Sequence, residues 1–429
     1  MDKVKRLRNL FKGDPIIWGI FFILCMVSII EVYSSSSILG YKSGNYWKAA
    51  LYHSGLLLVG GGVMIVTLNI PCKYFKALTP PAVVVSGILL VLVYFIGTSA
   101  NGAARWINFF GIPLQPSELA KGTLVLATAQ ILSSLQTPNG ADKNAMKYIG
   151  IVALPFIALV FPENFSTAAL MAAVVILMMF VGRVPLKQMG YLFSVLILLL
   201  VIAVTLVWGL GKSKAELMAE NAPDKQLTEM VSNGKEAVDI EKAEEEAPRR
   251  HGLLHRLDTW KERIEDFGKP RPNPEDFDLD KDGQVGHAHI AIASSDVIGV
   301  GLGNSVQRDF LPLAFSDFIY AIIMEEGGLF GGFFVAFLYL ALLIRTGYIA
   351  RNCQNAFPAY LAMGLAMLIV VQAVFNMMVA VGLAPVTGQP LPLISKGGTS
   401  SIINCAYIGV ILSISRTAAK KDPKGIISD

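Results

Sequence analysis

The sequence predicts an all-α polytopic membrane protein with about ten transmembrane helices and one long extracytoplasmic loop. Of its 429 residues, 54% are hydrophobic and only 16% are charged, whereas ordinary globular chains carry about 25% charged residues. Whole segments, such as 82–100 and 189–211, contain no charge and are long enough to cross a hydrocarbon core. The net charge of +4 comes from basic residues placed by membrane topology, so it does not indicate nucleic-acid binding.

Ten apolar segments are candidate transmembrane helices. The first follows a basic N-terminal segment, residues 1–15, but it contains Glu31 and lacks an A-x-A-like cleavage site, so we expect a retained helix and not a cleaved signal peptide. The fifth is short, which suggests a tilted helix or a neighbouring re-entrant turn. The expected helices span residues 16–36, 51–70, 81–99, 117–134, 148–161, 165–182, 189–211, 317–344, 358–381 and 400–416.

The distribution of Lys and Arg predicts the orientation of these helices. With the N-terminus in the cytoplasm, the cytoplasmic segments carry seventeen basic residues. The short outer loops carry only four, Lys42, Lys48, Arg105 and Lys396. Because basic residues collect in cytoplasmic loops, both termini are expected in the cytoplasm, including the tail 417–429. Helices one to seven then occupy 16–211, and helices eight to ten occupy 312–416.

Residues 212–311 form a large extracytoplasmic loop, and long loops cross the membrane regardless of their charge. Its first part, 212–248, is polar and free of aromatic residues, so we expect it to be mobile or marginally helical. The stretch 249–268 has apolar residues at helical spacing and predicts an amphipathic helix, either in the lipid headgroup layer or packed on the rest of the loop. "DLDKDGQVGHAH" begins like a calcium loop, but His289 stands at the twelfth position, where Glu is needed. We therefore favour a turn of solvated acids.

Two charged residues open the fourth span. Glu118 and Lys121 are three residues apart, so they lie on one helical face and can form a neutralising pair. Ionisable residues inside a membrane are functional candidates, but a pair that only fixes helix packing is equally compatible with this spacing.

Three acids occupy the eighth predicted span. Asp317 falls in its first turn on the outer side, where the helix N-terminus favours a carboxylate and water has access. Such a group can act as a general base, although it could also simply cap the helix. Glu325 and Glu326 lie about two turns deeper, so we expect them to hold the helix bundle or a cation.

The outer loops add polar groups at membrane depth, where broken backbone is tolerated only if it lines a cavity. Residues 97–118 and the Gly- and Pro-rich 381–401 are such loops. Residues 299–312, "GVGLGNSVQRDFLP", look like a flexible Gly-rich segment, and without a following GK[ST] they do not indicate nucleotide binding. An acid and several cations facing outward predict an anionic, lipid-linked substrate. The polar candidates in the first two loops are Arg105, Trp106, Lys396, Thr399 and Ser400.

Three blocks in this order resemble the SEDS family of membrane glycosyltransferases (FtsW, RodA, SpoVE). They are "GAARWINFFGIPLQPSELAK", "GVGLGNSVQRDFLPLAFSDFIYAIIMEEGGLFGG" and "GLAPVTGQPLPLISKGGTSSIINCAYIGVILSISR". The resemblance covers nearly the whole chain and implies a SEDS-type fold.

The resemblance also implies an activity, the polymerisation of lipid II into β-1,4-linked glycan strands outside the cytoplasmic membrane. It assigns the role of general base to Asp317, the Asp of the S-D-F-I-Y match, and leaves Arg105 and Lys396 to stabilise the leaving pyrophosphate. A divalent cation, Mg or Mn, is chemically reasonable at the pyrophosphate. The matched motifs extend the substrate-binding candidates to Glu118, Lys121, Asn164, Ser305 and Gln307.

The sequence departs from the family pattern at two positions. Asn164 stands where the family usually has Asp, so it can form hydrogen bonds but cannot act as an acid or a base. Lys396 replaces Tyr and changes the local charge.

The first span, with its basic lead and Y-S-x-S-S stretch, resembles the division branch (FtsW) more than the elongation branch (RodA). The division branch implies a class B penicillin-binding transpeptidase and other divisome proteins as partners, and a place at the septum. Two other classes stay open from the residues alone: a flippase or other transporter, and a scaffold whose acids are structural.

Overall fold

The computed structural model describes residues 12–35, 47–100, 103–109, 112–211, 253–268, 279–311 and 314–418. The chain divides into two compact units. The first comprises residues 1–188 and 276–429, and the second comprises residues 189–275.

All ten predicted spans are helices, so the predicted fold class is confirmed. In the described part of the chain, seven are long and apolar enough to cross a membrane, and α6, α7 and α8 are the other three. The chain is therefore a multi-pass membrane protein. The ten helices are α2 (Pro15–Ser34), α4 (Trp47–Asn69), α5 (Cys72–Ile96), α6 (Pro116–Ser134), α7 (Ala145–Val160), α8 (Phe165–Val181), α9 (Leu186–Leu210), α15 (Ile319–Arg351), α16 (Ala356–Ala380) and α17 (Thr399–Ala418).

The largest differences from the predicted boundaries are in α5 and α15. Helix α5 begins at Cys72 and not at 81, since it continues through Pro80 and Pro81, as membrane helices often do. Helix α15 begins at Ile319 and runs on to Arg351. Its C-terminal part forms an ion pair with the start of α2, where Arg345 Nη2 lies 2.6 Å from Asp14 Oδ2.

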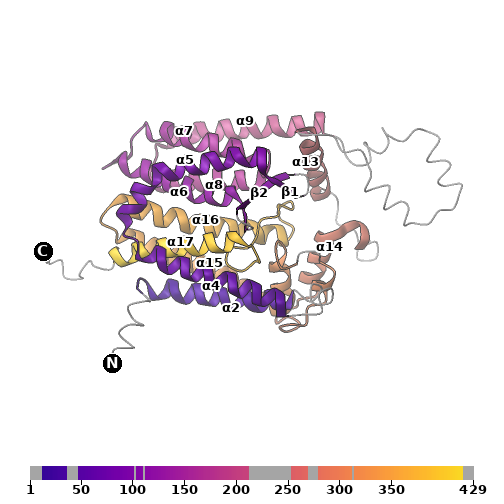
Figure 1. Cartoon of the computed structure of the whole chain (residues 1–429). Coiled ribbons are helices and arrows are strands. Elements are labelled where there is room, and N and C mark those ends of the chain that lie inside the picture. Colours follow the sequence, from indigo (N-terminus) through magenta and orange to yellow (C-terminus); the bar gives the residue numbers. More distant parts are fainter. Residues whose placement is uncertain are drawn as a thin grey trace, which may run out of the picture. The chain divides into compact units, whose positions relative to one another are not determined.

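In the first unit the helices run roughly side by side (Figure 1). Among the candidate spans, α16 and α17 are the most buried. Small residues bring α17 close to α4: a Cβ on Gly60 would lie 2.7 Å from Cys405 Sγ, and one on Gly409 would lie 2.6 Å from the Met64 carbonyl oxygen. Close backbone approach at small residues is a common source of helix association in membranes.

Short strands, which the sequence did not predict, lie in the first unit. Strands β1 (Thr98–Ala100), β2 (Ala103–Phe109) and β3 (Ile112–Leu114) form an antiparallel sheet between α5 and α6. Strands β4 (Gln136–Thr137) and β5 (Gly140–Ala141) form a hairpin. In Figure 1, β1 and β2 lie at the same end of the bundle as α14 (Leu279–Ala293).

Helix α15 is interrupted at Gly328, whose φ of 65° and ψ of −168° are not helical. A neighbouring segment, residues 296–301, is hydrogen-bonded into the break. Val300 N and Gly301 N donate to the carbonyls of Glu325 and Glu326, at 2.9 and 3.0 Å. Leu329 N and Phe330 N donate to the carbonyls of Asp296 and Val297, at 3.2 and 3.3 Å.

The glycines of this segment are required for its position. Gly299 has a φ of +82°, and a Cβ there would lie 2.6 Å from the Glu326 carbonyl carbon. The glycines permit a close backbone contact between this segment and α15, and the flexibility of residues 299–312 stays a prediction.

The large loop is described in part. The calcium-like stretch was predicted to be a turn, but residues 279–293 form α14, which is kinked at Gly283 with a φ of 52°. In the second unit the predicted amphipathic helix is present as α13 (Leu253–Gly268), where Lys261 Nζ donates to the Gly211 carbonyl at 3.1 Å. Whether α13 meets lipid stays a prediction, and residues 212–252 lie outside the described residues.

Candidate active site

Asp317 lies in a turn that immediately precedes α15, and it is half-buried. Its carboxylate oxygen Oδ1 accepts a hydrogen bond of 2.8 Å from Ser316 Oγ. A Cβ added to Gly388 would lie 3.5 Å from the other oxygen, Oδ2. The position in the first turn of the helix was therefore predicted slightly wrongly, and the acid sits on a non-helical turn.

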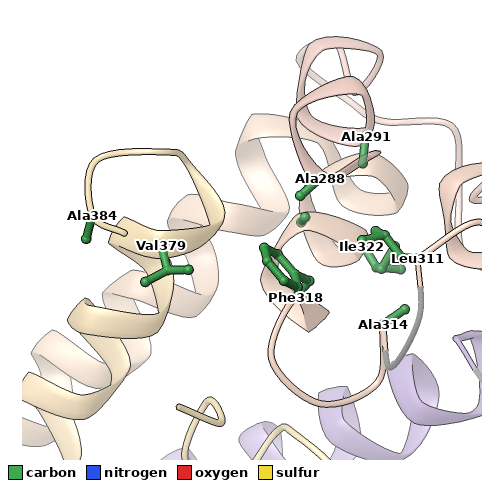
Figure 2. Packing of buried hydrophobic residues seen from close by; sticks show 9 residues of the cluster. Ala288, Ala291, Leu311, Ala314, Phe318, Ile322, Val379 and Ala384 are labelled. Carbon is green, nitrogen blue, oxygen red and sulfur yellow. The ribbon is translucent and has the colours of Figure 1, made fainter. Parts of the chain in front are cut away.

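The residue after Asp317 belongs to an apolar cluster (Figure 2). Phe318, the residue after Asp317, is 1% exposed and packs with Ile322 of α15 and Val379 of α16. The rest of the cluster comes from α14, the segment before Asp317, α15 and the loop after α16, namely Ala288, Ala291, Leu311, Ala314, Ala321 and Ala384.

Asn376 of α16 explains why the helix starts after Asp317. Its Nδ2 donates to the Asp317 carbonyl at 2.8 Å and to the Gln389 carbonyl at 2.7 Å. A side-chain donor thus occupies the Asp317 carbonyl and joins the turn to the loop between α16 and α17. Asn376 is 1% exposed, so this clamp is built into the interior.

The same loop brings Lys396 alongside the turn. Lys396 N donates to the Phe315 carbonyl at 2.9 Å, and Ser395 Oγ donates to the Ser316 carbonyl at 2.5 Å. Lys396 Nζ lies 4.7 Å from the centre of the Phe315 ring, which is a cation–π contact. Burial lowers the pKa of Lys396 below that of a free lysine. The cationic side chain of Lys396 therefore contacts Phe315, which lies two residues before Asp317 in the sequence.

Asn164 lies at the start of α8, and hydrogen bonds link this end of α8 to the same loop. Its Oδ1 accepts hydrogen bonds from Thr167 N at 3.1 Å and from Ser166 Oγ at 2.8 Å, so it caps the helix. Gln389 Nε2 donates to Thr167 Oγ1 at 2.7 Å. An amide performs this capping as well as an acid would.

The predicted pair in α6 is present. Lys121 Nζ lies 2.8 Å from Glu118 Oε1, and both residues are almost fully buried. Lys121 Nζ also donates to Gln372 Oε1 at 2.7 Å, and Gln372 Nε2 donates to the Pro390 carbonyl at 3.0 Å. The Gln372 amide thus links the Glu118–Lys121 pair to the loop between α16 and α17.

The other predicted candidates have structural partners of their own. Arg105 Nε donates to the Glu163 carbonyl at 2.9 Å, next to Asn164, and Trp106 lies in β2. Thr399 Oγ1 donates to the Pro113 carbonyl at 3.0 Å, and Ser400 Oγ to the Gly397 carbonyl at 2.8 Å. Their contacts with a substrate stay predictions.

The two deeper acids have different surroundings. Glu325 accepts hydrogen bonds from Ser305 Oγ, from Val306 N at 3.0 Å and from Gln307 N at 3.3 Å. It therefore caps the short helix η1 (Gln307–Asp309). Gln307 Oε1 lies 2.8 Å from His287 Nδ1 on α14.

Glu326 accepts a hydrogen bond from Ser34 Oγ at the end of α2, and Arg308 Nη1 donates to the same hydroxyl at 3.0 Å. These contacts match a structural role for both acids. Cation binding by either one stays a prediction.

Asn376, Gln372 and Gln389 are the residues that sequence reasoning missed. Gln372 and Asn376 are four apart on α16, so they share one face of an otherwise apolar span. Two amides at that spacing are the signal that would have found them. Asn376 holds the turn of a half-buried carboxylate, and Lys396 contacts the same turn at Phe315. The carboxylate is able to take a proton from one group, and the cation is able to stabilise negative charge on another.

The chain matches the sequence profile of a family of cell cycle proteins, FtsW/RodA/SpoVE, over residues 15–224 and 252–420. Among its relatives is a protein of Geobacter metallireducens named "Probable peptidoglycan glycosyltransferase FtsW", which is 29% identical over 95% of this chain and 96% of its own length. A protein of the same name from Pseudomonas fluorescens is 30% identical over 93% of this chain and 87% of its own.

Solved structures share the fold. One chain of a peptidoglycan synthase complex aligns with 96% of this chain and all of its own length, with a TM-score of 0.64 and 22% identity. The rod shape determining protein RodA of Thermus thermophilus aligns with 96% of this chain and all of its own length, with a TM-score of 0.60 and 20% identity.

Proposed function

Because the chain belongs to the FtsW/RodA/SpoVE family of cell cycle proteins, we propose that it is a peptidoglycan glycosyltransferase that polymerises lipid II into β-1,4-linked glycan strands. The observation that carries the mechanism is the turn of Asp317, which the Asn376 amide, the Ser395 hydroxyl and the Lys396 backbone N–H hold in place. A general base needs such a fixed geometry and access to its substrate. The names of the relatives support the activity and favour the division branch over elongation and transport.

In the proposed reaction the Asp317 carboxylate accepts the proton of the acceptor sugar's 4-hydroxyl. The hydroxyl oxygen attacks the anomeric carbon of the donor, and the new glycosidic bond forms. The bond from the anomeric carbon to the pyrophosphate oxygen breaks, and undecaprenyl pyrophosphate leaves with the electron pair. A single displacement inverts the anomeric centre, which gives the β linkage.

Lys396 is the described cation with contacts nearest the turn, and we assign to it the stabilisation of the leaving pyrophosphate. Arg105 is the second candidate for this role. It is fixed beside Asn164 by its bond to the Glu163 carbonyl, and Asn164 reaches the same loop through Ser166, which donates to Asn164 Oδ1 and accepts a hydrogen bond from Gln389 Nε2 at 3.3 Å.

The residues around Asp317 fit a divalent cation that arrives with the pyrophosphate. The side-chain oxygens Asn376 Oδ1 and Gln389 Oε1 are buried there and accept no hydrogen bond, and Mg²⁺ and Mn²⁺ prefer oxygen ligands. Within the described residues no group of three His, Cys, Asp or Glu side chains is placed to hold a metal. If bound there, the ion would neutralise charge on the pyrophosphate, with the side-chain oxygens of Asn376 and Gln389 as its candidate ligands.

We place the activity on the outer face of the cytoplasmic membrane at the division septum, with both termini in the cytoplasm. The basic residues of the predicted cytoplasmic segments support this orientation. A class B penicillin-binding transpeptidase and the divisome are the proposed partners. The similar chain from a synthase complex that combines polymerization and crosslinking supports a transpeptidase partner.

The test is polymerisation of purified lipid II by the chain in complex with a cognate transpeptidase whose own active site is blocked. The product is separated by length and digested with a muramidase that cuts β-1,4 bonds. Asp317→Asn is compared with Asp296→Asn, a matched control because Asp296 is an exposed acid in the preceding segment.

Polymer from the native protein and from Asp296→Asn, with none from Asp317→Asn, supports the proposal. Equal polymer from Asp317→Asn removes that residue from the chemistry. If the native complex forms no polymer but moves labelled lipid II across vesicles, the protein is a transporter and the proposal is wrong.

A further inference from the structure

A buried hydrogen-bonded pair lies between α2 and α4, and the proposed reaction assigns no role to either residue. Ser28 and His53 are both 0% exposed. Ser28 Oγ lies 2.7 Å from His53 Nε2 and 2.6 Å from the Ile394 carbonyl oxygen. The pair therefore connects two membrane helices to the loop that carries Lys396.

The direction of these hydrogen bonds follows from the proton count. A backbone carbonyl only accepts, so the single Ser28 hydroxyl proton is donated to Ile394. His53 Nε2 must then carry a proton and donate it to Ser28 Oγ. His53 Nδ1 is buried and has no hydrogen-bond partner, so the neutral ring with its proton on Nε2 accounts for every contact.

The segment that this pair holds is strained. Leu393, next to Ile394, has a φ of +66°, which a branched side chain rarely adopts and which persists only where the surroundings enforce it. Tyr339 OH also donates to the Pro392 carbonyl, and Leu391 N donates to Ser395 Oγ at 2.8 Å. Each contact in this turn is therefore needed to keep its shape.

The held segment leads directly to the candidate base. Two residues after Ile394, Lys396 N bonds to the Phe315 carbonyl, and Ser395 Oγ bonds to that of Ser316. We propose that His53 is a positioning residue: through Ser28 it holds the Ile394 carbonyl and so keeps Lys396 against Phe315, beside Asp317. The catalytic part of this inference rests on the proposed function, whereas the structural part does not.

If His53 only fills space, the volume of its ring is sufficient. If it positions Ser28, an N–H donor is required. His53→Gln keeps a donor at the corresponding distance along the side chain, and His53→Leu keeps bulk without a donor. Ser28→Ala removes the bridging hydroxyl with little change in volume. If His53 acts through Ser28, the double variant Ser28→Ala/His53→Leu should be no worse than Ser28→Ala alone.

The first readout is the rate at which an amine-reactive acetylating reagent modifies Lys396, measured by mass spectrometry on the full chain in detergent. Exposed Lys147 serves as the internal control. His53→Leu and Ser28→Ala should both raise the rate at Lys396, and His53→Gln should match the native protein. Equal rates in the Leu and Gln variants, or no change in either, would overturn the proposal.

The second readout is lipid II polymerisation with the blocked transpeptidase partner. Ser28→Ala leaves the Ile394 carbonyl without its donor and should lower the rate about tenfold. His53→Leu, which leaves Ser28 without the donor that orients it, should also lower the rate, whereas His53→Gln should keep the native rate. A rate in His53→Gln as low as in His53→Leu would overturn the positioning role. If the native protein has no polymerase activity, the proposed function fails, but the Lys396 modification rates still decide this inference.

Discussion

Gly328 is a position where one added methyl group should strongly destabilise the protein. Its backbone lies in a region that essentially only glycine adopts. A Cβ there would overlap the Val297 carbonyl and lie 2.5 Å from Gly299 N. The neighbouring Gly327 has open space around it, so Gly327→Ala is a matched control inside the same helix.

The magnitude follows from two terms. The backbone conformation costs a non-glycine residue about 1–3 kcal/mol. Moving residues 296–301 away also breaks some of the four backbone hydrogen bonds that join them to α15, each worth roughly 1 kcal/mol. With two of them lost, Gly328→Ala should lower the free energy of unfolding by about 3–5 kcal/mol. Gly327→Ala should be neutral or stabilising by up to about 1 kcal/mol, since alanine favours helix.

The assay compares the apparent midpoint of thermal unfolding of both variants in one detergent, together with hydrogen exchange of the 297–301 amides. Gly328→Ala should unfold at a lower temperature and exchange faster at these amides, while Gly327→Ala should behave like the native protein. Equal midpoints and equal exchange in the two variants would refute the account of the break in α15.

Three further predictions concern the charged groups. Glu118→Gln should destabilise the fold by about 3–5 kcal/mol, because it leaves Lys121 buried without its counter-ion, and adding Lys121→Met should recover part of the loss; thermal unfolding of the single and double variants measures this. Because burial lowers the pKa of Lys396, its charge is present at low pH and is lost as pH rises, earlier than for a free lysine. The polymerisation rate should fall at alkaline pH, and in Lys396→Arg, which stays charged, this fall should occur at higher pH. The same pH dependence in both proteins would exclude a role for the Lys396 charge in the reaction. Chelation with EDTA should abolish polymerisation and Mg²⁺ or Mn²⁺ should restore it, whereas full activity in EDTA would exclude the proposed cation.

The spans were predictable because charge is nearly absent from them, and hydropathy reports that directly. The start of α5 was missed because Pro80 and Pro81 look like a helix start, although a membrane helix continues through such residues. The break in α15 could not be read from the sequence, since it depends on the contact between Gly299 and Gly328, twenty-nine residues apart.

The candidate site was partly predictable for the same reason. Asp317 and the Glu118–Lys121 pair attract attention because ionisable groups are rare in apolar segments. The amides of Gln372 and Asn376 carry no charge, so they stood out less, yet they join the pair and the Asp317 carbonyl to one loop. Their role depends on loop carbonyls, and backbone groups leave no mark in the sequence.

The most direct test of the central claim is the single-turnover rate of glycosidic bond formation for Asp317→Asn, with lipid II binding measured separately. A general base typically contributes about 10²–10⁴-fold. We predict a loss in that range with lipid II affinity close to native and with Asp296→Asn at the native rate. A loss of less than about tenfold, with affinity unchanged, would contradict Asp317 as the base.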